Sequence, residues 1–441
     1  MLRALAIATF VATPLAAQDF FTLKGHGGPI MDIAVSPSGQ IATASFDNSV
    51  GLWDGTTPNW YEGHRAAVNV VAFWGAGTPI SAGDDFEVRF WPTVNASHVL
   101  GRHQGKVVDL AYSKQAERVA SASWDGSIGL WPLSASVGGA LYSPLDGQEP
   151  KFLKGHAQGV NDVVFSEDGT RLYSASVDGT IRVWDVESAT ETQILVKHGF
   201  GVNELIVNEQ DGWLAYGAVD GGTRLIDITT GELIADFTLD RRPILSMAYH
   251  ADSHQLAVGD GEGYIMVVDT ATRKITRDFR ATQRGPIWAL AFSPDGQNIH
   301  AGGIEDIMYS WPISAMDEHG PMTGITRSFL EDPTTLPNGE RQFKRKCSIC
   351  HTLASGSARK AGPSLYQLFG RPAGTVPDYT YSDTLNGSEI VWSAETINAL
   401  FDLGPDHYIP GTKMPMQRIA KKTDRDDLID YLRAATAQGE N

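Results

Sequence analysis

Short apolar runs alternate with polar, glycine-containing turns over the first three quarters of the chain, and the pattern repeats. One repeat begins at Gly25-His26, continues through the apolar M-D-I-A-V and the polar S-P-S-G, and ends in an apolar run that closes at Trp53. The equivalent closing positions of the later repeats are Trp91, Trp131, Trp184, Ile226, Val268 and Trp311. Successive closing positions lie 38 to 43 residues apart, except for one step of 53 that contains an insertion within residues 134–150. A period of about 40 residues predicts one supersecondary unit per repeat, and the insertion predicts an exposed loop.

The polar positions of the repeat carry a recurring set of side chains. In the fourth repeat the set is His156, Ser176, Asp178 and Trp184. The first and third repeats carry the His, Asp and Trp of the set at His26, Asp47, Trp53, His103, Asp125 and Trp131. This pattern resembles the WD40 family, whose repeats form the four-stranded blades of a β-propeller. The resemblance implies an all-β, seven-bladed propeller over residues 18–314, with each set joined in one hydrogen-bonded network.

A propeller must close its ring of blades, and the chain offers a segment for this purpose. Residues 19–24 precede the first Gly-His and could add the outer strand to the last blade, which would remove two exposed sheet edges. Ile226 and Val268 stand where other repeats have Trp, and no Gly-His opens the sixth or seventh repeat, so blades five to seven depart from the pattern.

Histidines outside the network are the candidates for a metal site in the propeller. They are His98, His250, His254, His300 and His319. His250 and His254 are four residues apart, but in a β-rich region this spacing does not place two side chains on one helical face. We therefore expect these histidines to be exposed or hydrogen-bonded.

A different motif follows the repeats. Residues 315–335 contain several Pro and Gly without clear periodicity and predict a linker. The motif Cys347-Ser348-Ile349-Cys350-His351 then uses both cysteines of the chain and is the attachment signature of a c-type haem. Residues three apart lie on one side of a helical turn, so both thiols can reach the two vinyl groups of one porphyrin while His351 faces the iron. A zinc site would need two further thiols, and neither a thioredoxin-like pair nor a disulfide requires the adjacent His.

The segment around this motif resembles a known family along nearly its whole length. Residues 339–436 are similar to a mitochondrial-type class I cytochrome c, which implies a small all-α domain over residues 336–441. The matching strings are G-E-R-Q-F at 339–343, G-P-S-L at 362–365, F-G-R-P-A-G at 369–374, Y-S-D at 381–383, Trp392, Y-I-P-G-T-K-M at 408–414 and D-D-L-I-D-Y-L at 426–432.

The resemblance also implies the roles of single residues. Met414 is the sulfur ligand of the iron opposite His351, with Met416 as the competing sulfur, and Pro363 offers its carbonyl oxygen to the second ring nitrogen of His351. Three further side chains are expected around the haem propionates, namely Arg371, Tyr381 and Trp392. The first and last helices are expected to cross where Gly339 permits close approach.

Some positions depart from the family pattern. Leu385 stands where the family has a polar Asn near the haem, and Met416 stands where it has an aromatic residue. Asp406 and His407 replace two Lys of the basic ring through which such cytochromes meet acidic redox partners. These departures leave the iron ligands intact and affect the docking face.

Charge and the N-terminus restrict the partners and the compartment. The 441 residues contain 35 Lys and Arg against 52 Asp and Glu, a net charge of -17, which opposes binding to nucleic acid. Residues 335–441 have a net charge of about +1, so the acidity belongs to the propeller. Residues 1–17 combine Arg3, an apolar run and small residues, which predicts a signal peptide and hence export. No other apolar run approaches the ~18 residues of a membrane span, so an integral membrane protein is not expected.

These observations favour one function over two others. A single haem with two protein ligands leaves no open iron position, which favours electron transfer over catalysis. We expect an exported, periplasmic c-type cytochrome that carries single electrons through one covalently bound haem, with the propeller as protein-interaction module and a redox protein as partner. The alternatives are a propeller-cytochrome oxidoreductase, whose propeller binds a substrate or second cofactor, and a scaffold whose cytochrome is a redox sensor.

Charge also predicts a contact within the chain. Basic residues are expected on the haem-exposing side of the cytochrome at Lys344, Arg345, Lys346, Arg359, Lys360, Lys413, Lys421 and Lys422. Because tethered domains of opposite charge meet at high effective concentration, we expect the acidic propeller to dock on this side and to loosen at high salt.

Overall fold

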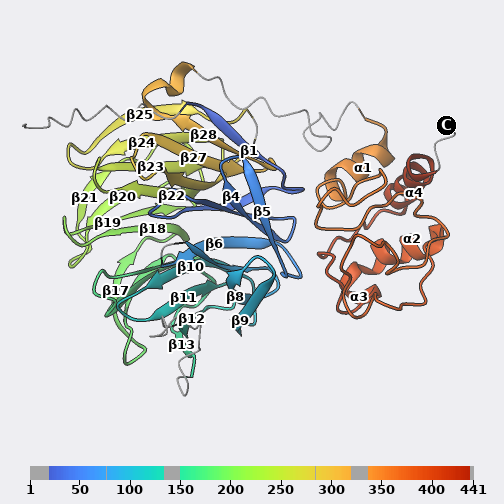
Figure 1. Cartoon of the computed structure of the whole chain (residues 1–441), viewed down its shortest axis with the longest axis horizontal. Helices are drawn as coiled ribbons and strands as arrows, with labels where there is room; N and C mark the ends of the chain where they lie inside the picture. The colour runs from blue at the N-terminus through green and yellow to red at the C-terminus, as the bar shows by residue number, and fades with distance from the viewer. Residues whose placement is uncertain (1–18, 76, 134–148, 284, 319–335, 438–441) are drawn as a thin grey trace, which may run out of the picture.

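The computed structural model describes residues 19–75, 77–133, 149–283, 285–318 and 336–437, which fold into two units joined in sequence by the segment 319–335 (Figure 1). The predicted signal peptide, most of the predicted linker and most of the 134–150 insertion lie outside the described residues. Among the residues that the structure describes, no helix combines the length and the apolar character needed to cross a bilayer.

The N-terminal unit is built from seven four-stranded antiparallel sheets within the described residues. Blade one consists of β2 Ile30–Val35, β3 Ile41–Ser45, β4 Ser49–Asp54 and β5 Thr57–Glu62. Blade two consists of β6 Val68–Trp74, β7 Thr78–Gly83, β8 Glu87–Thr93 and β9 Ala96–Arg102. Blade three consists of β10 Val107–Ser113, β11 Arg118–Ser123, β12 Ser127–Pro132 and β13 Lys151–Lys154.

The later blades repeat this arrangement. Blade four consists of β14 Val160–Phe165, β15 Arg171–Ser176, β16 Thr180–Asp185 and β17 Thr190–Lys197. Blade five consists of β18 Val202–Asn208, β19 Trp213–Ala218, β20 Thr223–Asp227 and β21 Leu233–Asp236. Blade six consists of β22 Ile244–His250, β23 Gln255–Asp260, β24 Tyr264–Asp269 and β25 Lys274–Arg280. Blade seven contains β26 Ile287–Phe292, β27 Asn298–Gly303 and β28 Ile307–Pro312. The unit is therefore the expected seven-bladed β-propeller.

The ring closes through the first strand of the chain. Strand β1, Phe21–Lys24, pairs with β28 in the register Phe21 to Ser310 and Lys24 to Ile307 and so becomes the outer strand of blade seven. Buried side chains of blades one and seven, such as Ile30 and Met308, share one apolar cluster. The predicted closure by residues 19–24 is confirmed, and it leaves no gap between these two blades.

Carboxylates on the inner strands connect neighbouring blades. Asp32 on β2 accepts a hydrogen bond from the amide of Val71 on β6 at 2.9 Å. Asp109 on β10 likewise accepts from Val163 on β14 at 2.9 Å, and Asp162 on β14 accepts from Leu205 on β18 at 2.5 Å. Each bond satisfies a backbone donor of the next blade, so these acids hold blade against blade.

The recurring His, Asp and Trp form the expected networks, with one correction. In blade four His156 contacts Asp178 at 2.9 Å, but the hydroxyl that bonds both His156 and Trp184 belongs to Ser174, at 2.8 Å from each. The sequence pattern assigned this place to Ser176, whose hydroxyl instead donates to the carbonyl oxygen of Gly159. Both serines share one face of β15, but Ser174 lies within reach of the Trp184 ring nitrogen.

The C-terminal unit is helical and packs its first and last helices against each other. Its helices are α1 Asn338–Lys346, α2 Ala394–Leu403, α3 Pro405–Tyr408 and α4 Lys422–Thr436, and the short 3-10 helix η1 Ile313–Glu318 follows the propeller. Phe343 of α1 and Leu428 and Leu432 of α4 belong to the same buried cluster. A Cβ atom at Gly339 would overlap the backbone of Asp427, so glycine permits the crossing of α1 and α4, as predicted.

Candidate functional site

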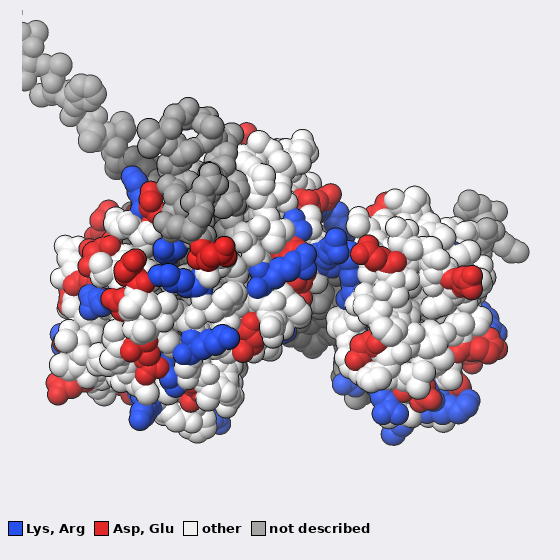
Figure 2. All heavy atoms as spheres, turned by 90° about the horizontal axis from the view of Figure 1, so that it is seen from below, with Lys and Arg blue, Asp and Glu red and all other residues white. Residues whose placement is uncertain are grey.

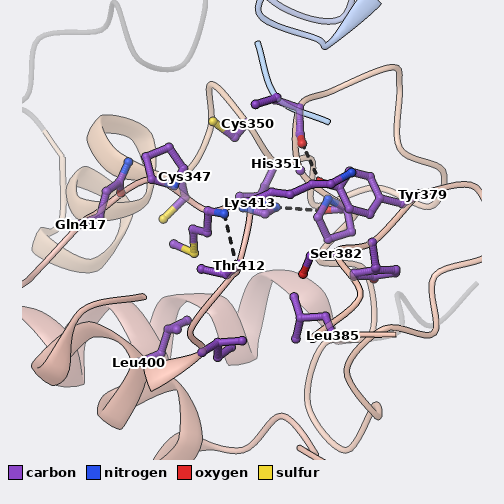
Figure 3. A pocket seen from close by; sticks show the side chains of 18 of the residues that line it. Cys347, Cys350, His351, Tyr379, Ser382, Leu385, Leu400, Thr412, Lys413 and Gln417 are labelled. Carbon is purple, nitrogen blue, oxygen red and sulfur yellow. Dashed lines mark hydrogen bonds between the residues drawn. The ribbon is translucent and has the colours of Figure 1, made fainter. Parts of the chain in front are cut away.

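An apolar cavity of about 360 Å³ lies in the helical unit where it faces the propeller. Its lining includes all eight side chains that the sequence singled out, namely Cys347, Cys350, His351, Pro363, Arg371, Tyr381, Trp392 and Met414. Figure 3 shows Cys347, Cys350 and His351 in the upper half of the view, with Leu385 and Leu400 below them. Residues from six separate segments of the unit therefore meet around one space.

The two cysteines enter this space from the turn that ends α1. Cys347 is the C-cap of α1, and its carbonyl oxygen accepts hydrogen bonds from the amides of Cys350, at 3.0 Å, and His351, at 2.9 Å. Both cysteines line the same cavity. Both cysteines are free and buried. Burial raises the pKa of the Cys347 thiol to about 12 and that of Cys350 to about 11, so both thiols are protonated at neutral pH.

His351 is held with one ring nitrogen fixed. Its Nδ1 lies 2.8 Å from the carbonyl oxygen of Pro363, which can only accept, so Nδ1 carries the hydrogen and Nε2 keeps its lone pair. Burial lowers the pKa of His351, which favours the neutral ring that a metal needs. Gly362 lies against this ring, and a Cβ atom there would overlap it. The predicted contact of Pro363 is therefore present.

The two methionines that competed as ligand lie in different surroundings. Met414 lines the cavity and packs against the buried cluster of the helical unit. Met416 is 53 % exposed and is not among the residues that line the cavity. Its sulfur instead lies against Gly404, at the N-cap of α3. Only Met414 has its side chain directed into the space that His351 faces.

The three residues expected near the propionates surround one part of the cavity. Arg371 donates to the carbonyl oxygens of Tyr366, at 2.6 Å, and Ser364, at 2.8 Å. Burial lowers the pKa of Arg371, and the hydroxyl of Tyr381 accepts a long hydrogen bond from the amide of Val376 at 3.4 Å. The guanidinium of Arg371 is therefore positioned by backbone carbonyl oxygens, and the ring of Tyr381 packs edge to face on that of Tyr379 at 4.9 Å.

Sequence reasoning did not assign a role to several polar lining residues. The hydroxyl of Ser382 and the amide oxygen of Gln417 are buried without a hydrogen-bond partner among the described residues, and both line the cavity. Tyr379 also lines it and donates to the carbonyl oxygen of Ala361 at 2.8 Å. Orphaned polar atoms beside an apolar cavity fit a bound group that is mainly apolar and carries polar substituents, as a haem does.

Comparisons with known proteins agree with both halves of this description. A family model for the WD domain, G-beta repeat, matches residues 18–54, 95–132, 147–185 and 273–311, and a model for cytochrome c matches residues 336–436. A cytochrome c of Sesamum indicum is 45 % identical over 107 residues, which cover 24 % of this chain and 94 % of that protein. A cytochrome c of Ginkgo biloba is 43 % identical over 112 residues, which cover 25 % of this chain and 98 % of that protein.

The chain belongs to the cytochrome c family. Its membership rests on the C-terminal unit, the cytochrome c domain, and its N-terminal unit is a WD40 propeller. A cytochrome c domain implies a covalently bound haem, electron transfer and a redox partner, and WD40 repeats imply a protein-interaction module.

The propeller also contributes to the lining of the haem cavity of the cytochrome c domain. Its residues come from loops of blades one to three and are Phe46, Asn48, Arg65, Ala66, Ala67, Asp84, Phe86 and Lys106. These loops are the Gly-His loops and the Asp turns, whose His to Asp contacts place them on the same face of the propeller. We call it the network face, defined by residues 25–29 and 46–48 and their equivalents in the other blades.

Charged side chains of both signs occur where the two units meet (Figure 2). Arg359 of the cytochrome c domain pairs with Glu62 of β5 at 2.8 Å. Lys413, by contrast, has its pKa lowered by burial and then by the like charge of Arg65. The junction is therefore not a simple match of a basic surface with an acidic one.

Proposed function

We propose that this protein is an exported, periplasmic electron-transfer protein that carries single electrons through one covalently bound haem. The observation that carries the proposal is the convergence of the eight predicted side chains on one cavity of about 360 Å³. The haem, when bound, supplies an iron centre that changes its charge by one electron. The cytochrome c domain holds it, and the WD40 propeller is the module that meets other protein surfaces.

In this proposal three residues of the turn after α1 would hold the haem. Cys347 and Cys350 would bind it through two thioether bonds, in which each S–H adds across one vinyl group. His351 would offer Nε2 to the iron, because its Nδ1 hydrogen is held by the carbonyl oxygen of Pro363. Both thiols lie buried in the turn after α1, next to that ring.

Met414 would hold the iron from its own part of the cavity lining. Its neutral thioether would favour the reduced iron and so a high reduction potential. Arg371, Tyr381 and Trp392 line the same cavity, where the donors among them would offset the charge of the propionates. With His351 and Met414 both used as ligands, no iron position would be open for a substrate, which favours electron transfer over turnover.

The network face supports the role of the propeller as an interaction module. Over blades three to five it carries exposed apolar side chains in the Gly-His loops and Asp turns, namely Trp124, Val177, Phe200 and Val219. Exposed large apolar residues gathered on one face are typical of protein-binding surfaces. A redox partner protein that docks here would lie next to the haem domain.

One measurement of intact mass tests attachment, stoichiometry and export together. We expect the mature chain to begin at Gln18 and to carry the mass of one haem, because residues 1–17 are removed on export and thioethers survive denaturation. Cys347→Ser combined with Cys350→Ser should remove the haem mass and the haem stain after denaturing electrophoresis. Met416→Leu is the matched control and should keep both. A stain that persists in the double cysteine variant would refute covalent attachment, and a retained residue 1 would refute export.

A further inference from the structure

A short loop of the cytochrome c domain makes a close contact with blade one of the propeller. Ala358 and Arg359 both have positive φ angles, of 47° and 55°, and this turn directs Arg359 toward the propeller. The guanidinium carbon of Arg359 lies 4.1 Å from the ring centre of Trp60 on β5, and the guanidinium pairs with Glu62 at 2.8 Å. A cation-π contact and an ion pair are thus combined on one side chain.

Trp60 is itself fixed by the network of blade one. Its ring packs edge to face on His26 at 4.7 Å and on Trp53 at 5.7 Å. His26 in turn is held by Asp47 at 2.9 Å and Thr43 at 2.7 Å. The surface that receives Arg359 is therefore rigid before the contact forms, which lowers the entropic cost of docking.

Gly27 shows that this part of the propeller is shaped for the contact. The residue after the network His donates its amide to the network Asp in blades one to four, through Gly27, Arg65, Gln104 and Ala157. The repeat therefore accepts a side chain at this place, and the φ angle of Gly27 lies outside the left-handed region. Gly27 is buried where the other three are exposed. A Cβ atom there would overlap the backbone of Ala358 and Arg359 in the cytochrome c domain.

The same contact places residues of the propeller over the side of the haem cavity that faces it. With Arg359 seated on blade one, Phe46, Asp84 and Phe86 of the network face line the cavity together with Lys346 and Lys413 of the cytochrome c domain. The side of the cavity that faces the propeller is thereby closed to any protein-sized reagent. Electron exchange through this side requires that the two units first separate.

We infer that Gly27, Trp60 and Glu62 form a docking site for the cytochrome c domain of the same chain, and that the docked propeller shields the haem from redox partners until it opens. This inference deepens the proposed function, since it concerns access to the same haem cavity. The occupant is this chain's own Ala358 and Arg359, because the site is complementary to that backbone at Gly27 and to that side chain at Trp60. The two units exchange between a docked and a separated state, and the population of the separated state regulates electron exchange.

The test adds a single methyl group at the docking site of the full-length holoprotein. Gly27→Ala keeps the amide that Asp47 binds and leaves the haem cavity's own residues unchanged, but it should force the two backbones apart. We expect a larger radius of gyration by small-angle scattering. We also expect the reduced haem to be oxidised about fivefold or more faster by an acidic, protein-sized oxidant such as a blue copper protein, since the rate scales with the open fraction. Small ferricyanide should show a smaller change.

Two further variants keep the test decisive. Ala157→Ser adds one heavy atom at the equivalent place of blade four and should behave as wild type. Arg359→Gln removes the ion pair and the cation-π contact from the other side of the junction and should also open the molecule. This variant decides the test if Gly27→Ala lowers the thermal stability of the propeller. Unchanged scattering and unchanged oxidation rates in both Gly27→Ala and Arg359→Gln would overturn the inference.

Sedimentation of the same samples identifies the occupant. A wild-type dimer that becomes a monomer in Gly27→Ala would mean that the site holds the cytochrome c domain of a second copy, and would overturn docking within one chain. Failure of the proposed function would look different, because a chain without attached haem shows no haem absorption, whereas the scattering comparison does not depend on the haem.

Discussion

At the scale of single residues, the surroundings of a side chain decide between candidates of the same chemistry. Two sulfurs, those of Met414 and Met416, follow the turn at 409–412, and only Met414 lines the cavity that His351 faces. Met416 is exposed and packs on Gly404. Ligand identity therefore depends on the direction that the turn gives each side chain.

We predict that Met414→Ala opens the sixth iron position and lowers the reduction potential, because the neutral thioether that favours the reduced iron is lost. The weak near-infrared sulfur-to-iron band of the oxidised protein should disappear. In Met416→Leu the band and the potential should stay as in the wild type. A band that survives Met414→Ala but vanishes in Met416→Leu would assign the other sulfur.

The attachment residues could be found from the sequence alone, whereas other residues of the cavity could not. Cys347, Cys350 and His351 are fixed by local spacing on one helical turn, and spacing is readable in a sequence. Ser382 and Gln417 lie in the cavity because distant loops fold over it, and no local pattern marks them. The sequence pattern assigned the network hydroxyl to Ser176 for a related reason. Ser174 and Ser176 share one face of their strand, and they differ in that Ser174 accepts the hydrogen bond of the Trp184 ring nitrogen.

At the scale of elements, the inner strands of the propeller bring acidic side chains together. Asp162 on β14 is surrounded by Asp109 on β10 and Glu204 on β18, and Glu204 also interacts with Asp32 on β2. Burial raises the pKa of each of these carboxyls, to about 7 for Asp32. Asp162 in its protonated form donates a hydrogen bond to Asp109 while it accepts the amide of Leu205.

A raised pKa makes the folded propeller less stable as pH rises. The folded state retains a proton at Asp162 that the unfolded chain releases above about pH 4. The contribution of this proton to the free energy of unfolding is therefore complete below that pH and is lost as pH increases toward the pKa of Asp162 in the folded state. We predict that Asp162→Asn, which can keep both hydrogen bonds without a charge, raises the thermal midpoint of the propeller by about 2 °C or more at pH 8. The gain should be smaller at pH 5.

Asp168 provides a control because its pKa is shifted in the opposite direction from that of Asp162. It is exposed, and hydrogen bonds from Ser166 and Thr170 lower its pKa to about 2. Asp168→Asn should therefore lower the midpoint slightly and by the same amount at pH 5 and pH 8, since Asp168 is ionised at both. Equal effects of Asp162→Asn at the two pH values would show that Asp162 is charged in the folded propeller.

Most elements of the propeller were predictable because each repeat encodes its own blade. The closing positions at Ile226 and Val268 lack the Trp, yet β20 and β24 occupy the same places as the Trp-bearing strands. In blade five Tyr216 stands where the serine of the network would be and lies 3.3 Å from His198. A different side chain can thus complete a network, so the period of the repeat predicts a blade more reliably than any one of its residues.

At the scale of the whole molecule, net charge predicts that the two units attract each other but does not predict where they meet. The acidic propeller and the slightly basic cytochrome c domain agree with the expected attraction. At the junction, however, Lys413 faces Arg65 as well as Asp85, while Lys344 and Lys422 pair within their own helices with Glu340 and Asp426. Shape at Gly27 and the side chain of Arg359 select the site, and neither is visible in a count of charges.

We predict that salt loosens the junction only in part. The pair of Arg359 and Glu62 is solvent-accessible, so it contributes about 0 to 1 kcal/mol and is screened as the Debye length falls from ~30 Å at 0.01 M to ~3 Å at 1 M. Small-angle scattering across this range should show a modest increase in the radius of gyration of the wild-type protein. In Glu62→Gln the radius of gyration should depend on salt less strongly than in the wild type. An equally strong dependence in this variant would show that other charges cause the effect.

The closure of the ring by β1 also sets the order in which the molecule folds. Lys24 pairs with Ile307, so the strands that meet in blade seven are separated by most of the propeller sequence. Bringing together two segments so far apart has a large entropic cost, and such long-range pairing is slow compared with the formation of single hairpins. Until β28 exists, β1 is an unpaired strand and a hazard for aggregation. The last step of propeller folding therefore awaits synthesis of residues 307–312, which come late in the propeller sequence and precede the cytochrome c domain.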